Sequence, residues 1–254
     1  MSFTVSIVTD EKDLKEIYRL RYKVYCDEWE FENPDRHENG LEIDEYDKHA
    51  LHFAVKDDSQ KTVGTVRMIL NSESGFPIEK YCEIDPDKKA GPAESSAEIS
   101  RLAISRVYRR RSEDKYLYGP DEERRIIGGF DRPYNYTENR THFRRTDDRY
   151  RNKPGSARSR HSSNDERRSR HELVTSLYKA VYHESKRRQL THWYAVMTKG
   201  LIILLNRFGF KFHPIGDPVD YHGIRTPYLG EIQKIEEEVE AQKPEIYGEF
   251  TRGL

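Results

Sequence analysis

Residues 41–70 constrain the fold of this chain most, because they place an arginine inside an apolar strand. Arg67 stands in the run TVGTVRMIL, which alternates as a largely buried strand does. A buried guanidinium is costly unless a carboxylate meets it. Upstream of the two strand-like runs stand three closely spaced carboxylates, those of Glu42, Asp44 and Asp47. Such a network either only holds the fold together or also forms a substrate site, since both kinds of network show this pattern.

Length, charge and cysteine content limit the number of domains, the kinds of partner and the location that we expect. The chain has 254 residues, enough for one large domain or two small ones with a real core. Its formal net charge of −1 gives no overall attraction to nucleic acid or acidic membranes. No apolar run approaches the ~18 residues of a membrane span, and the N-terminus shows no signal pattern. Two cysteines, Cys26 and Cys82, do not make a disulfide framework, so we expect a reduced, cytoplasmic protein.

The N-terminal part predicts a strand, a helix and three more strands. Residues 2–8 alternate as a short strand. From Glu11, apolar residues recur at three- and four-residue steps, which predicts a helix capped by Asp10 and closed by Trp29. The three strands are expected at residues 49–55, 62–70 and 97–105.

The last of these strands, AEISRLAIS, carries two charged residues, Glu98 and Arg101, with Ser100 beside them. A regular strand would put Glu98 and Arg101 on opposite faces, unless a bulge intervenes. A second carboxylate and a second arginine at strand positions favour a polar network over chance placement.

Residues 106–170 form a compositionally distinct, Arg-rich insertion. They hold 17 Arg and 2 Lys against 11 Asp and Glu, and they show no sustained periodicity. A loop of this length inside a compact domain is usually disordered or functional. It is either a basic arm for an acidic partner or nucleic acid, or a solvated insertion whose charges stay in water. The run IIGGF, residues 126–130, could anchor it to the body.

Regular structure is expected to return at Glu172, with an amphipathic helix that finishes in the basic run 186–188. A strand, a short apolar helix and two last strands are expected at residues 191–197, 199–208, 210–216 and 225–232. The alternation predicts a mixed α/β single domain over residues 1–232, with helices packed on a central sheet. Residues 233–254 are expected to be a charged tail, an exposed helix followed by frayed residues.

Several familiar catalytic motifs are absent from the sequence. It contains no GxxxxGK[ST], no GxGxxG after a strand, no GxSxG and no HExxH. His49 and His52 are three residues apart, but in a strand they would face opposite sides, which argues against a metal pair. We therefore expect no metal site.

Four segments, LRYKVYCDEWEFE, GLEIDEYDKHALHFAV, TVGTVRMIL and AEISRLAIS, resemble a known group of enzymes. They are similar to acyltransferases associated with PEP-CTERM/exosortase systems and, more distantly, to acyl-homoserine-lactone (autoinducer) synthases and N-acyl amino acid synthases. HWYAVMTKGLIILLNRFGFKFHPIGDPVDYHG resembles the C-terminal half of the exosortase-associated group. The resemblance covers roughly residues 5–110 and 172–232. It implies a GNAT-like (acyl-CoA N-acyltransferase) fold that takes an acyl chain from a thioester, typically on acyl carrier protein.

The resemblance also implies a set of site residues, to which we add Ser100. The matching positions are Arg21, Tyr25, Trp29, Glu42, Asp44, Asp47, Arg67, Glu98 and Arg101. Two departures bear on function. The insertion stands where an ordinary GNAT enzyme has its R/Q-x-x-G-x-G/A pyrophosphate loop, which argues against acetyl-CoA as donor. Tyr25 stands where the lactone synthases favour Phe.

Acylation of an amine needs a proton acceptor, donors for the oxyanion and close positioning of both substrates. We expect Glu98, on the central strand, to be the base or to orient a water. We expect an ion-pair cluster of Arg21, Asp44, Asp47 and Arg101. Arg67 is either a clamp for a substrate carboxylate or part of the scaffold. Tyr25 and Trp29 either wall a substrate pocket or belong to the core.

The sequence thus predicts an N-acyltransferase that moves a fatty acyl group from acyl carrier protein, or from acyl-CoA, to the amine of an amino acid or similar small molecule. No bound cofactor is expected. The first alternative is an autoinducer synthase that uses S-adenosylmethionine. The second is a non-catalytic GNAT-like binding module that uses the basic arm.

Overall fold

The computed structural model describes residues 3–108, 160–221 and 223–254. Its strands form one mixed sheet in the order β1-β2-β3-β4-β5-β8-β6, with β7 paired to β8. Only β4 and β5 run parallel; the other described pairs are antiparallel. The strands span Thr4–Val8 (β1), Ala50–Lys56 (β2), Thr62–Leu70 (β3), Ser96–Ile104 (β4), His192–Met197 (β5), His213–Pro214 (β6), Val219–Asp220 (β7) and Ile224–Glu231 (β8).

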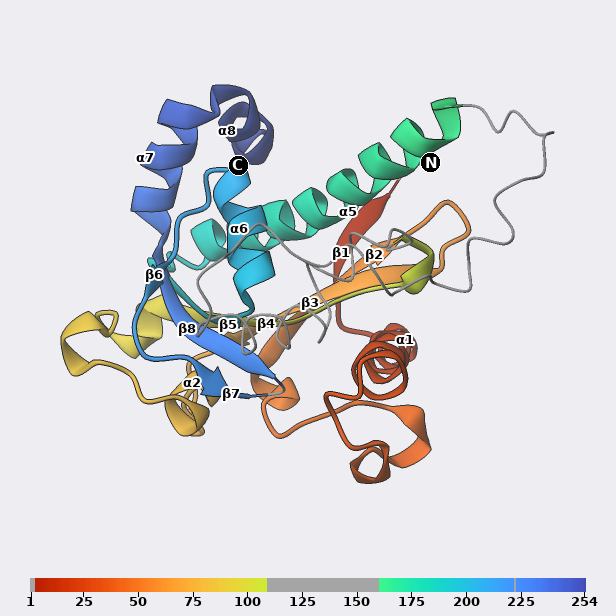
Figure 1. Cartoon of the computed structure of the whole chain (residues 1–254), viewed down its shortest axis with the longest axis horizontal. Coiled ribbons are helices and arrows are strands. Elements are labelled where there is room, and N and C mark those ends of the chain that lie inside the picture. The colour runs from red at the N-terminus through yellow and green to blue at the C-terminus, as the bar shows by residue number, and fades with distance from the viewer. Residues whose placement is uncertain (1–2, 109–159, 222) are drawn as a thin grey trace, which may run out of the picture.

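Helices cover both faces of the sheet. Figure 1 shows α1 on one side of the sheet and α5 on the other. The α-helices span Glu11–Tyr22 (α1), Pro77–Tyr81 (α2), Arg160–Arg187 (α5), Lys199–Arg207 (α6), Ile232–Gln242 (α7) and Pro244–Thr251 (α8). A π-helical segment, Lys23–Glu28, continues α1. Short 3-10 turns span Pro34–Arg36, Glu38–Gly40, Asp47–His49, Pro86–Lys88, Ala93–Ser95 and Arg106–Tyr108.

The main hydrophobic core lies between the sheet and α5. Leu173, Leu177 and Val181 of α5 are buried in one cluster with Val66 and Met68 of β3. Gly64 lets the helix approach the sheet closely, because a Cβ there would lie 2.8 Å from Cδ2 of Leu173. On the opposite face β3 carries Arg67, so this strand separates an apolar layer from a charged one.

The N-terminal predictions are confirmed in detail. The strand expected at residues 62–70 is β3 with the same bounds. Asp10 caps α1 by accepting a hydrogen bond from Asp13 N at 2.9 Å, and Trp29 ends the π-helical segment. The bulge suspected in β4 is present: Thr65 faces Ala103 while Arg67 faces Ser100, which leaves one extra residue on β4. The predicted mixed α/β fold class is confirmed.

Two expectations at the C-terminal side of the chain are wrong. The helix expected from Glu172 begins at Arg160, so residues 160–170, assigned to the insertion, are helical. Their charged composition hid this, because a sequence without an apolar stripe carries no helical periodicity to detect. The end of the tail is the helix α8, and its Phe250 is buried against Tyr182 and Phe210. The IIGGF run lies outside the described residues.

Within the described ranges, none of the helices has the length and apolar character that crossing a membrane requires.

Candidate active site

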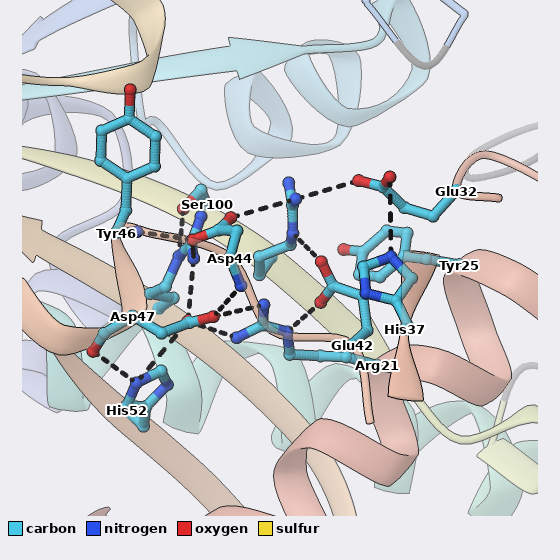
Figure 2. Close-up of polar contacts among 12 residues, drawn as sticks. Arg21, Tyr25, Glu32, His37, Glu42, Asp44, Tyr46, Asp47, His52 and Ser100 are labelled. Carbon is cyan, nitrogen blue, oxygen red and sulfur yellow. Dashed lines mark hydrogen bonds and ion pairs between the residues drawn. The ribbon is translucent and has the colours of Figure 1, made fainter. Parts of the chain in front are cut away.

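An ion-pair network covers the α1 face of β3 and β4, and Arg21 lies at its centre (Figure 2). The Arg21 side chain is fully buried near the end of α1. Its NH1 and NH2 groups donate to the two carboxylate oxygens of Asp47 at 2.7 and 3.1 Å, and its Nε donates to Glu42. This two-pronged geometry satisfies the guanidinium that the sequence placed on the buried side of the helix.

Arg67 of β3 belongs to the same network. Its NH1 donates to Asp44 Oδ1 at 2.6 Å and to Asp47 Oδ1 at 2.8 Å, and its Nε donates to Ser100 Oγ at 3.1 Å. With 1% of its surface exposed, Arg67 has the carboxylate partners that its strand position demanded.

Arg101, in the bulge of β4, forms ion pairs with carboxylates of this network. Its Nε donates to Glu42 Oε1 at 3.0 Å, and its NH2 donates to Glu32 Oε1 at 3.1 Å and Asp44 Oδ2 at 3.2 Å. Its φ of 51° is left-handed, an unusual conformation for a side-chain-bearing residue in a strand. The guanidinium also lies 5.6 Å from the ring centroid of Tyr25. These ion pairs hold the strained residue in place.

The arginines keep the network carboxylates ionised. Burial alone would raise the pKa of Glu42, but Arg101 and Arg21 outweigh it and hold that pKa at about 2. For Asp47, Arg21 and Arg67 likewise overcome burial, so its pKa lies well below the ordinary value. Both groups carry charge at any physiological pH.

Glu98 of β4 is a buried carboxyl group of a different kind. Its Oε2 accepts a hydrogen bond from Ile78 N at 2.8 Å, at the start of α2, and 2% of the residue is exposed. Across the described part of the chain, no ion pair to Glu98 is recorded. Burial raises the pKa of Glu98 to about 7, against the opposing effects of the Ile78 N–H and of Arg67 and Arg101. A carboxyl group of this kind exchanges its proton near neutral pH.

The strands β4 and β5 diverge just beyond Glu98. They pair only from Ser96 to Glu98, opposite His192–Tyr194, although β4 continues to Ile104 and β5 to Met197. Backbone groups that face this gap therefore lack a β5 partner. In this part of β4, the Leu102 carbonyl accepts a hydrogen bond from the Tyr25 hydroxyl at 2.9 Å.

Cavities of different character meet at the gap. An apolar cavity of about 100 Å³ reaches from Trp29 and Leu102 to Tyr178 of α5 and Trp193 of β5. A polar cavity of about 40 Å³ is lined by Glu98, Arg67 and Tyr221. Tyr25, Ser100, Arg101, Val196 and Arg225 line both cavities. The gap therefore offers one apolar and one polar space that share these five lining residues.

A larger polar cleft, of about 430 Å³, lies next to the polar cavity. Both share Glu32, Arg101 and Tyr221 as lining residues, and Asp44 lines the cleft as well. Among the described residues, no three His, Cys, Asp or Glu side chains are grouped as a metal site would require.

The structure brings all the predicted site residues to one region, and it adds others that the sequence reasoning missed. Glu32 stands in a quoted segment, three residues after Trp29, but nothing in its spacing marked it. His37 lies beside it, with Nε2 3.8 Å from Glu32 Oε2. Tyr221 follows β7 and Arg225 lies in β8, and both line the polar cavity. Nothing in the sequence of this region indicates which cavity its residues line.

Comparison with known proteins agrees with this geometry. Residues 20–119 match the family described as acetyltransferase (GNAT) domain. That span contains the network, Glu98 and the bulge. No curated protein matches the sequence.

Solved structures extend the likeness to nearly the whole fold. The AHL synthase LasI has a TM-score of 0.53 at 17% identity, covering 91% of this chain and 90% of LasI. The CoA-dependent acyl-homoserine lactone synthase BjaI, solved with SAM and isopentyl-CoA, has a TM-score of 0.59 at 14% identity, covering 96% and 90%. FeeM, an N-acyl amino acid synthase from uncultured soil microbes, has a TM-score of 0.52 at 11% identity, covering 95% and 96%.

The fold is therefore that of a single GNAT-like α/β domain, as the sequence predicted. The family match and the fold together support an acyltransferase.

Proposed function

We propose that this protein transfers an acyl group from a thioester to the amine of an amino acid or similar small molecule. The observation that carries the proposal is the meeting of an apolar and a polar cavity at the gap between β4 and β5. An acyl chain fits the apolar side, and a small polar acceptor fits the side that contains Glu98. The reacting carbonyl then lies at Ser100 and Arg101, which line both spaces.

The chemistry follows from these positions. The amine nitrogen attacks the thioester carbonyl, a C–N bond forms, and the C–S bond breaks as the thiolate leaves. Glu98, directly or through a water, accepts the proton that the amine loses, and this proton then reaches the thiolate. Backbone N–H groups that face the gap stabilise the oxyanion. No step requires a metal.

The other predicted site residues then have supporting roles. Arg21, Glu42 and Asp47 form a scaffold, because each is buried and engaged by an oppositely charged partner. We assign Arg67 to the scaffold as well, since its NH1 and Nε are bonded to Asp44, Asp47 and Ser100 rather than directed at a ligand. Tyr25 and Trp29 form part of the wall of the apolar cavity.

We propose acyl carrier protein as the donor, with acyl-CoA as the form to compare it against. A bacterial cytoplasmic location and a link to exosortase systems stay predictions from the sequence.

The test is to incubate the purified full-length protein with acyl carrier proteins and CoA thioesters of several chain lengths, together with a pool of amino acids and other amines. Products are identified by mass spectrometry. N-acylated products from at least one donor are expected. A folded protein that acylates none of the amines would refute the proposal.

A second candidate is an autoinducer synthase that uses S-adenosylmethionine. The polar cleft of about 430 Å³, with carboxylates of Glu32 and Asp44 in its lining, has room for an acceptor larger than an amino acid. Release of methylthioadenosine during turnover would move this candidate to first place. Acylation of another amine without that release would remove it.

A further inference from the structure

Trp193 lines the apolar cavity at the point where β4 and β5 come together. Trp193 and Ala97 are paired across the two strands, one position before the last pair, Glu98 and Tyr194. Side chains alternate along β5, so Trp193, Ala195 and Met197 share the face toward α5, and all three line the cavity. Met197 thus lies where the two strands have separated, and Trp193 lies where they are still paired.

The Trp193 ring is fixed in this position. Its Nε1 donates a hydrogen bond to Ser185 Oγ at 2.9 Å, and Ser185 in turn donates to the Val181 carbonyl at 2.8 Å. The ring also lies parallel to Phe212, with centroids 6.4 Å apart and an interplanar angle of 21°. Only 2% of Trp193 is exposed. A side chain held from two sides does not swing away to admit a longer ligand.

The size of the cavity limits what can lie between the gap and Trp193. Its volume is about 100 Å³. An apolar cavity of about 150 Å³ in another protein holds one benzene ring of six carbons. By that scale the cavity accommodates about four carbons beyond the carbonyl.

We infer that this protein selects short acyl groups, of about four to six carbons including the carbonyl carbon, and that Trp193 sets the limit. The inference rests on the proposed function, since it assigns the apolar cavity to the acyl chain. A chain that is too long must either displace Trp193 or leave its own carbonyl short of Ser100 and Arg101, and both reduce transfer. An extra methylene in a fixed apolar pocket typically costs roughly 10- to 200-fold in kcat/KM.

The experiment compares butyryl, hexanoyl, octanoyl and dodecanoyl thioesters, each on CoA and on acyl carrier protein, with the amine pool described above. For the wild-type protein we expect the highest kcat/KM with butyryl or hexanoyl donors and a loss of at least about 10-fold with dodecanoyl. Equal use of dodecanoyl donors would overturn the chain-length inference and leave acyl transfer established. No transfer from any donor would instead refute the proposed function.

Two substitutions test the role of Trp193. Trp193→Leu lengthens the cavity and leaves Ser185 bonded to Val181, so the preferred chain should grow by roughly two carbons. Ala195→Leu narrows the cavity and should reduce use of hexanoyl donors more than butyryl donors, a result that does not depend on the Trp193 variant folding. Phe210→Leu is the matched control, because Phe210 belongs to the same core but does not line the cavity. An unchanged chain profile in folded Trp193→Leu or Ala195→Leu protein would overturn the assignment, as would a shift in the control.

Discussion

Asp47 and Glu98 are both buried carboxyl groups, yet their surroundings move their pKa values in opposite directions. Asp47 meets two arginines, Arg21 and Arg67, and its pKa falls well below the ordinary value. Glu98 meets one backbone N–H, that of Ile78, and burial raises its pKa to about 7. Burial acts to raise the pKa of both groups; the difference is the presence or absence of a directly paired cation.

The comparison distinguishes carboxylates that stabilise the fold from a carboxyl group that is suited to proton transfer, within one charged region. A carboxylate that two guanidinium groups hold ionised cannot accept a proton near neutral pH, but it anchors the strands that surround it. A carboxyl group without a paired cation stabilises the fold less and titrates where proton transfer is useful. The network around Arg21 therefore positions β4, and we propose that Glu98 on the same strand acts on the substrate.

Glu98→Gln gives the largest expected effect and tests the catalytic side of the comparison. The amide oxygen still accepts the Ile78 N–H, but the side chain no longer takes a proton. We expect turnover to fall by about 10²–10⁴-fold, with little change in melting temperature. Steady-state kinetics and thermal unfolding of the same preparation measure both.

Exposed Glu83 supplies the matched control, since Glu83→Gln changes the same chemical group at the surface and should leave turnover unchanged. Full activity in stable Glu98→Gln protein would mean that another group is the base. A large drop in melting temperature would place Glu98 with the scaffold.

Arg21→Met tests the scaffold side. It removes the cation shared by Glu42 and Asp47, and it leaves two buried carboxylates with fewer partners. Breaking a buried ion pair from one side costs about 3–5 kcal/mol of unfolding free energy, which chemical denaturation measures. Arg19→Met, at an exposed position on the same helix, should leave stability nearly unchanged. Equal stability of the two variants would show that the network does not hold the fold together.

The contributions of the two kinds of carboxyl group to folding stability should change with pH in opposite directions. The folded-state pKa of Glu98, about 7, lies above its ordinary value of 4.5, so the folded protein binds this proton more tightly than the unfolded chain does. Its contribution to stability is therefore present below pH 4.5 and is lost as the pH rises through about 7. Glu42 behaves oppositely: its contribution is present above pH 4.5 and is lost as the pH falls through about 2.

The pH dependence of enzyme activity tests whether Glu98 is the base. Because Glu98 must be deprotonated, kcat/KM should rise about tenfold per pH unit below pH 7 and level off above it. In Glu98→Gln protein, any residual activity should lack this rise, and stability should fall less between pH 4.5 and 7 than in the wild type. A rise with the same midpoint in the variant would assign the titration to another group.

Much of this arrangement could be predicted from the sequence, but the pairing within it could not. Arg67 in an apolar strand required a carboxylate, and two members of the acidic trio, Asp44 and Asp47, supply it. The sequence left either a regular strand or a bulge open for the segment with Glu98 and Arg101, and the structure has the bulge. That Arg21 and Arg101 would share Glu42 depends on how the loop before β2 folds, and spacing alone does not encode that path.

The cavities could not be predicted from the sequence, for the same reason. Trp193 and Tyr221 come from segments that read as an ordinary buried strand and a loop, and only the divergence of β4 from β5 gives them a shared space. The early start of α5 was missed because a charged helix carries no apolar periodicity.

Tyr25→Phe has the smallest expected effect and tests whether the gap itself depends on the network. Leu102 lies on the part of β4 that β5 no longer pairs, so the Tyr25 hydroxyl satisfies its carbonyl. Water in the adjoining cavity can replace that hydroxyl, and we therefore expect a loss of about 0.5–1.5 kcal/mol in unfolding free energy. Tyr18→Phe is the control, because no hydrogen bond from its hydroxyl is recorded in the described part of the chain. A loss as large as that of Arg21→Met would mean that the Tyr25 hydroxyl, and not only the arginines, holds the strained bulge in place.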